Sequence, residues 1–240
     1  VTLSLTASPD IITNPTDIVL VLDRSGSMTG EALTNMKKGA NAFVDIIAEA
    51  TGGASSGEIG SGSRIGVVSF ADTATQDTSL ITSVEDIKSA INGLTANGST
   101  NHADAFKKAV SLLDSLENGN ARVMVMFTDG KTTSGPDPNP IAQAAKLDGI
   151  IIYCIGLISE DGIDPQVLDE WATPPSGSHV LIAPDDEDLE ELFKTLAENI
   201  SKTGATDIVI DEVINSDFTI TEVKLPDMGT VVKESDTRLK

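Results

Sequence analysis

The chain has 240 residues, with 16 Lys and Arg against 37 Asp and Glu, which gives a formal net charge of −21. Such an excess of acid repels the phosphates of nucleic acids and anionic lipids, so we expect neither as a partner. Hydrophobic residues make up 40% of the chain, which is enough for a folded core and argues against global disorder. No apolar run is long enough for a membrane span, and the single cysteine, Cys154, excludes an internal disulfide and a multi-cysteine metal site.

Short apolar runs recur along most of the chain and have the length and composition of buried strands. Runs of this kind are typical of parallel strands that are covered on both faces. They lie at 17–22, 64–70, 122–127, 149–156 and 178–182. A further segment at 75–81 is a candidate for a short edge strand.

Between these runs, apolar residues recur at three- and four-residue intervals, which predicts helices. The predicted helices lie at 32–50, 84–94, 103–116, 140–147 and 185–200. Because strands alternate with helices, we expect an α/β fold, a doubly wound and mostly parallel sheet flanked by helices. The Gly- and Ser-rich segment 52–63 is expected to be a mobile surface loop.

The two ends of the chain depart from this alternation. Residues 206–214 and 218–225 alternate apolar and polar side chains, as do Val1, Leu3 and Leu5 near the start. A period of two is typical of strands with one solvated face. We therefore expect both ends to contribute to a small β annex beside one large domain. The expected division is 1–15, 16–203 and 204–240.

Polar side chains follow the predicted strands at the edge where parallel sheets bind ligands. Two groups come directly after the first and third strands, and one threonine precedes the third helix. The five residues are Asp23, Ser25, Ser27, Thr100 and Asp129. Since all of them offer oxygen, they suit a hard cation, Mg²⁺ or else Mn²⁺ or Ca²⁺. Ordinary turn and helix-cap chemistry also favours Ser, Thr and Asp at such positions and is the alternative explanation.

The run Asp23-Arg24-Ser25-Gly26-Ser27, followed by Thr100 and Asp129 in that order, resembles the metal-ion-dependent adhesion site of von Willebrand factor type A domains. The resemblance covers roughly residues 16–201 and implies a Rossmann-like fold. It implies hydroxyl ligands from Ser25, Ser27 and Thr100, with Asp23 and Asp129 holding the metal directly or through water. It also implies a partner protein whose Asp or Glu carboxylate completes the coordination.

Enzyme motifs are missing, since the sequence has no GxSxG, no GxxxxGK phosphate loop and no HExxH. We therefore expect no enzyme but an adhesion or protein-binding module of a surface protein. The acidic composition and flanking β segments resemble bacterial cell-surface and pilus-tip members of the family. Such a protein would be extracellular, cell-surface or cell-wall anchored through regions outside this chain.

The partner of such a module would be host extracellular matrix or another surface subunit, and we expect the chain itself to be a monomer. Two alternatives remain open. One is a structural or assembly module of a pilus or multidomain surface protein. The other is an intracellular accessory domain to an AAA-type ATPase.

Five further residues carry expectations about the surroundings of the site. Arg24 is expected to be solvated or salt-bridged, and His102 to lie at the rim of the site, where it could contact a partner. Lys131 is expected to neutralise nearby acids. Cys154 is expected to be a buried, inert thiol, and Trp171 to serve packing.

Overall fold

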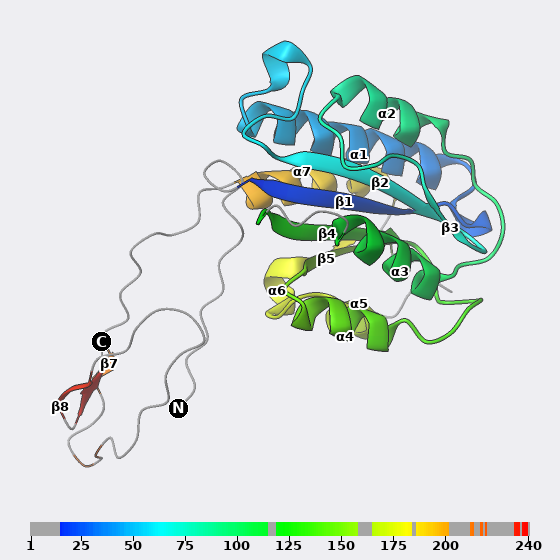
Figure 1. The fold of residues 1–240 in the computed structure, drawn as a ribbon. Helices are drawn as coiled ribbons and strands as arrows, with labels where there is room; N and C mark the ends of the chain where they lie inside the picture. The colour runs from blue at the N-terminus through cyan, green and yellow to red at the C-terminus, as the bar shows by residue number, and fades with distance from the viewer. Residues whose placement is uncertain are drawn as a thin grey trace. The chain divides into compact units, whose positions relative to one another are not determined.

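A six-stranded sheet in the order β3-β2-β1-β4-β5-β6 runs through the larger part of the chain (Figure 1). Its strands are β1 (Thr16–Asp23), β2 (Arg64–Phe70), β3 (Ala74–Gln76), β4 (Ala121–Thr128), β5 (Ile151–Leu157) and β6 (Val180–Ala183). Every neighbouring pair is parallel except β2 and β3. The strand order reverses between β1 and β4, which confirms the predicted doubly wound, mostly parallel sheet.

The computed structural model describes residues 15–114, 119–157, 165–183 and 186–201, and short pieces between 212 and 239. By its contacts the chain divides into two compact units, residues 1–204 and 205–240. The large unit contains the six-stranded sheet and its helices. None of the helices among the described residues is long and apolar enough to cross a membrane.

Helices cover both faces of the sheet in the large unit (Figure 1). One face is covered by α1 (Glu31–Ala50), α2 (Val84–Gly93) and α7 (Leu189–Ser201). The other is covered by α3 (His102–Leu113), α4 (Asn139–Leu147) and α5 (Pro165–Trp171). Short helical turns lie at η1 (Gly26–Met28), η2 (Ala54–Ser56), α6 (Ser176–His179) and η3 (Asp186–Asp188).

The central strand β1 shows why the sequence folds in this way. All eight of its residues are buried. Ile18, Leu20 and Leu22 pack into the core beneath α1, whereas Val19 and Val21 pack into the core beneath α3. Because successive strand residues point to opposite faces, a strand covered on both sides must be apolar throughout.

Two predicted strands differ from those observed. Residues 178–179 belong to α6, where the Ser178 N–H donates to Pro175 O at 3.1 Å, and β6 starts only at Val180. The predicted edge strand 75–81 is shortened to β3. The N–H groups of Asp77 and Thr78 both donate to Val67 O, which ends the regular pairing with β2.

The predicted final helix also begins later than expected. Residues 186–188 form the 3₁₀ turn η3, and α7 starts at Leu189. Leu189 is fully buried, and it packs in the same core as Phe193 and Leu196. Asp186, Glu187 and Asp188 therefore lie ahead of the α-helix rather than in its first turn.

The Gly- and Ser-rich segment 52–63 is a series of tight turns against the end of α1. The Gly53 N–H donates to Ala48 O at 2.9 Å, and the Gly60 N–H donates to Thr51 Oγ1 at 2.8 Å. A Cβ on Gly53 would lie only 2.0 Å from Glu58 O. The glycine at this position therefore permits close approach of the backbone, whereas composition alone suggests a mobile loop.

The smaller unit contains a three-stranded antiparallel sheet among its described residues. Its strands are β7 (Glu212–Val213), β9 (Arg238–Leu239) and β8 (Lys233–Ser235), in that order across the sheet. The strands predicted at 206–214 and 218–225 fall almost entirely outside the described residues, as do residues 1–14. The joint β annex of the two chain ends therefore stays a prediction.

Close packing of α1 on α7 generates a test of the fold. A Cβ on Gly39 of α1 would lie 2.6 Å from Phe193 Cδ2 and 3.0 Å from Leu189 O. We expect Gly39→Ala to lower the free energy of unfolding in urea by about 1–3 kcal/mol, because overpacking outweighs the higher helix propensity of alanine.

The matched control is Gly93→Ala at the end of α2, where a Cβ would meet no atom within 4 Å. This variant should be as stable as the wild type or slightly more stable, since alanine loses less conformational entropy on folding. Equal stability of the Gly39 variant and the wild type would contradict the observed packing of the two helices.

Candidate metal centre

The five predicted site residues lie at the carboxyl ends of β1 and β4 and at the start of α3. Asp23 is the last residue of β1, and Ser25 and Ser27 follow it in and around the turn η1. Asp129 follows β4, and Thr100 comes two residues before α3. Because β1 and β4 are parallel neighbours with Leu22 opposite Phe127, both strands end at the same edge.

Four of the five side chains form one hydrogen-bonded cluster. The Ser25 N–H donates to Asp23 Oδ1 at 2.8 Å, and the hydroxyls of Ser25 and Ser27 lie 3.1 Å apart. The Ser27 hydroxyl donates to Asp129 Oδ1 at 3.0 Å. Asp23 and Ser25 are buried, whereas Ser27 is exposed, so the cluster reaches solvent through Ser27.

The fifth side chain, Thr100, borders the same space. A Cβ built on Gly130 would lie 3.7 Å from Thr100 Oγ1 and 3.8 Å from Ser27 Oγ. Both hydroxyls thus face the short turn that follows Asp129. The structure therefore brings all five predicted residues together.

Backbone hydrogen bonds hold the loop after β1 against two neighbouring loops. The Arg24 N–H donates to Phe70 O at 2.9 Å, and the Gly26 N–H donates to Gly98 O at 2.9 Å. A Cβ on Gly26 would lie 3.3 Å from Gly98 O, which explains the small residue there. The Arg24 guanidinium donates to Ser69 Oγ and to Asn97 Oδ1, so it binds neutral protein groups where solvation or a salt bridge is predicted.

The loop between β4 and α4 is fastened to Thr100. The Thr100 N–H donates to Thr133 Oγ1 at 2.8 Å, and the Thr133 N–H donates back to Thr100 O at 2.9 Å. The Ser134 N–H donates to the same carbonyl at 3.2 Å. Lys131, in the same loop, is exposed, and its predicted role in neutralising acids stays a prediction.

The two carboxylates of the cluster are buried close to each other. The pKa of Asp23 is raised to about 6, mainly by burial, while the Thr128 hydrogen bond lowers it and the negative charge of Asp129 raises it. Burial also raises the pKa of Asp129. Among the described residues, no lysine or arginine is among the groups that shift either pKa.

The donor set is therefore two carboxylates and three hydroxyls, and no positive side chain in the described ranges shifts the pKa of either acid. Hard divalent cations bind such oxygen donors. In the described part of the chain, no three His, Cys, Asp or Glu side chains are grouped so that they could hold a metal ion. A cation at this edge of the sheet would thus depend on the hydroxyls as well as on the carboxylates.

His102 lies beneath the site and not at its rim, so that prediction is wrong. Its side chain is fully buried, with the ring between Phe70 and Trp171 at centroid distances of 5.2 and 4.7 Å. It is the first residue of α3 and precedes the buried Phe106 by four residues, which places both on one helix face. That spacing is the signal in the sequence that predicts a buried position.

Thr128 contacts the site as well, although it is not among the residues predicted from the sequence. It is fully buried at the end of β4, and its hydroxyl donates to Asp23 Oδ2 at 2.6 Å. The other side of the hydroxyl faces His102 Nε2 at 2.9 Å, and His102 Nδ1 lies 2.9 Å from Thr132 Oγ1. Burial lowers the pKa of His102 to about 3, so its imidazole is neutral at physiological pH.

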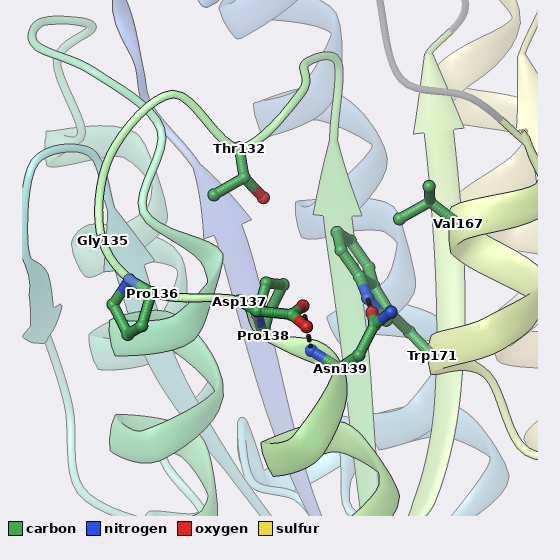
Figure 2. Close-up of a pocket in the computed structure, with 8 residues that line it drawn as sticks. All are labelled: Thr132, Gly135, Pro136, Asp137, Pro138, Asn139, Val167 and Trp171. Carbon is green, nitrogen blue, oxygen red and sulfur yellow. Dashed lines mark hydrogen bonds between the residues drawn. The ribbon is translucent and has the colours of Figure 1, made fainter.

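A pocket of about 260 Å³ lies beside the loop between β4 and α4 (Figure 2). Its lining residues are Thr132, Gly135, Pro136, Asp137, Pro138, Asn139, Val167 and Trp171. The Trp171 Nε1–H donates to Asn139 Oδ1 at 2.6 Å, and the side chain is 1% exposed, which confirms its predicted packing role. Cys154 is likewise buried as predicted, and burial raises the pKa of its thiol.

Comparison with known proteins places these observations in a family. The profile of the von Willebrand factor type A domain matches residues 17–195. Inter-alpha-trypsin inhibitor heavy chain H4 from Homo sapiens is 30% identical over 166 residues, which cover 62% of this chain and 16% of that protein. The chain thus spans about a sixth of the length of this relative.

Two solved structures share the fold. The pilus adhesin SpaC from Lactobacillus rhamnosus GG has a TM-score of 0.68 and 17% identity, over 97% of this chain and 38% of SpaC. Proximal thread matrix protein 1 from the mussel byssus, with a zinc-occupied MIDAS motif, has a TM-score of 0.66 and 21% identity, over 82% of this chain and 50% of that one. Because the family profile covers most of its length, the chain belongs to the von Willebrand factor type A domain family.

Proposed function

We propose that this chain is a metal-dependent protein-binding module of an extracellular or surface protein. Its cation would be held by Asp23, Ser25, Ser27, Thr100 and Asp129. The observation that carries the proposal is the pair of buried carboxylates beside three hydroxyls, with no lysine or arginine in the described part of the chain shifting the pKa of either acid. An ionised carboxylate that is buried without a positive partner costs several kcal/mol, and a divalent cation would offset that cost.

The composition of the donor set supports a docking role for the cation. Hydroxyls are neutral ligands, so a cation held largely by Ser25, Ser27 and Thr100 keeps a strong affinity for another anionic oxygen. The carboxylates of Asp23 and Asp129 are already engaged as hydrogen-bond acceptors within the protein. We therefore propose that an Asp or Glu side chain of a partner protein supplies the further oxygen.

Mg²⁺ is the cation that we propose, because it prefers hydroxyl, carboxylate and water oxygen at short distances. Binding of a divalent cation at this place is general in the family, and the related mussel protein is named with zinc there. Titration with each of the three metals, Mg²⁺, Mn²⁺ and Ca²⁺, would rank them.

The relatives support an extracellular setting. They include an inhibitor heavy chain, a pilus adhesin and a matrix protein of the mussel byssus, none of them named as an enzyme. The net charge of −21 disfavours approach of an acidic partner at long range. A bound cation supplies the attraction at short range, which makes recognition of a host matrix protein or another surface subunit dependent on metal.

Addition of metal should stabilise the wild type through the five-residue site. At a hundredfold excess of free cation over its Kd, the free energy of unfolding should rise by about 2.7 kcal/mol. The measurement is the thermal midpoint in EDTA and during titration with Mg²⁺, Mn²⁺ and Ca²⁺. Ser27→Ala should lose most of the response, because it removes a hydroxyl of the cluster.

Thr29→Ala is the matched control for this titration. The Thr29 hydroxyl lies two residues from Ser27 but donates to Gly26 O and stays outside the cluster. Its metal response should equal that of the wild type. An equal response of the Ser27 variant would argue against the proposed ligand set.

Stability of the metal-free protein should fall as the pH rises from about 4 through 6. Burial raises the pKa of folded Asp23 from 3.8 to about 6, so the folded state holds this proton more tightly than the unfolded chain. At about 1.4 kcal/mol per pKa unit, the loss attributable to Asp23 is about 3 kcal/mol.

The measurement is urea unfolding in EDTA, with Asp23→Asn as the reference that lacks this titration. Relative to that variant, the wild type should lose stability with rising pH and regain it when Mg²⁺ is added at pH 7.5, because the cation binds the ionised form. A difference between the two proteins that does not change with pH would contradict the assignment.

A small carboxylate should bind the metal-loaded protein. With Mn²⁺ bound, millimolar acetate should displace coordinated water and lower the water-proton relaxation enhancement. Chloride at equal ionic strength is the control and should leave the enhancement unchanged. If acetate lowers the enhancement no more than chloride does, the proposal that a carboxylate docks on the cation is contradicted.

A further inference from the structure

We propose that His102 is a positioning residue of the metal centre, which sets the Thr128 hydroxyl as a donor to Asp23 and ties that carboxylate to the loop between β4 and α4. The proposal rests on the proposed function, since it concerns the same cation site. His102 and Thr128 are not among the five proposed ligands, and both act through Asp23.

Three short contacts connect the loop to the buried carboxylate. Thr132 Oγ1 lies 2.9 Å from His102 Nδ1, and His102 Nε2 lies 2.9 Å from Thr128 Oγ1. The Thr128 hydroxyl then donates to Asp23 Oδ2 at 2.6 Å. Thr132 also lines the pocket in Figure 2, so the chain of contacts begins at the surface of the loop.

The number of protons sets the direction of these hydrogen bonds. An ionised carboxylate only accepts, so the single hydroxyl proton of Thr128 points to Asp23. Thr128 Oγ1 must then accept from His102, which requires the proton of the neutral imidazole to be on Nε2. Nδ1 is left as the acceptor for the Thr132 hydroxyl.

A second donor reinforces this arrangement. The Gly130 N–H approaches Thr128 Oγ1 at 3.2 Å, so this oxygen accepts from two groups while it donates to Asp23. Each accepted bond polarises the hydroxyl and strengthens the bond that it donates. With the Ser25 N–H on Oδ1 and Thr128 on Oδ2, both oxygens of Asp23 are fixed in position.

The imidazole itself is held firmly. Its ring packs between Phe70 and Trp171, and Trp171 is bonded in turn to Asn139 at the start of α4. The loop from Asp129 to Pro138 is therefore connected to this pair of packed rings in two places, through His102 near its start and through Trp171 just after its end. The polar contacts of the ring lead on to the carboxylate of Asp23, which aromatic packing alone would not require.

Two amide substitutions separate positioning from packing. In His102→Gln the side-chain amide can take the place of Nε2 and donate to Thr128. In His102→Asn the amide reaches only as far as Nδ1 and cannot make that bond. The measurement is the Kd of Mg²⁺ and Mn²⁺ by calorimetry at pH 7.5, with circular dichroism to show that each variant is folded.

We expect His102→Asn to weaken metal binding about tenfold, as is common when a group that orients a metal ligand is removed. His102→Gln should stay within about threefold of the wild type. Leu113→Ala is the packing control, since Leu113 is buried in the same core as the imidazole's neighbours but lies at the other end of α3. It should lower the thermal midpoint without changing the Kd.

Nitrogen NMR of the metal-free protein supplies a readout that simple packing would not move. We expect the Nε2–H tautomer of His102, and a shift of both ring nitrogens when the cation binds. The Nδ1–H tautomer, or a wild-type Kd in His102→Asn, would overturn the role of His102. If the wild type binds none of the three cations, the proposed function fails and this role fails with it.

Discussion

The negative charge of Asp23 at the end of the central strand is the constraint on which the site depends. β1 is covered by helices on both faces, and the side chain of its last residue, Asp23, is buried with the rest of the strand. A carboxylate at that position loses its hydration, and Asp129 adds a second negative charge beside it. Hydrogen bonds from Ser25 and Thr128 offset part of this cost, and a cation is the group that would offset the rest.

The fold brings the oxygen donors to this charge from distant parts of the chain. Parallel pairing of β1 with β4 places Asp23 and Asp129 at one edge, and the reversal of strand order opens the space between the loops that follow. Backbone bonds from Arg24 to Phe70 and from Gly26 to Gly98 then hold these loops together. Thr132 and Thr133 join the loop after β4 to the same frame through His102 and Thr100.

The sequence predicts the sheet and the set of five residues because both depend on local patterns. Continuous apolar runs identify buried parallel strands, and an Asp-x-Ser-x-Ser run after the first of them identifies the loop. The start of β6 was missed because α6 and β6 are directly joined, with no loop to separate their patterns. Whether the five residues bind metal stays a prediction, although their contacts are now described.

The contacts of His102 were beyond the reach of such patterns, because they join side chains that are 26 and 30 residues apart in the chain. Helical spacing from Phe106 indicates that His102 is buried, but only the packed structure shows what its nitrogens meet. A buried polar group must find partners, and here the partners lie on the strand end and on the loop.

The link through His102 has a thermodynamic consequence for recognition. Thr132 is exposed on a loop that a partner would contact, and its bond to His102 is the first of three contacts that end at Asp23. If docking of a partner shifts Thr132, it also shifts the orientation of a carboxylate at the cation site. Coupling between two binding events is reciprocal, so the factor by which metal strengthens partner binding equals the factor by which the partner strengthens metal binding. A polar relay in an otherwise apolar core would thus make the loop and the proposed cation site parts of one binding unit.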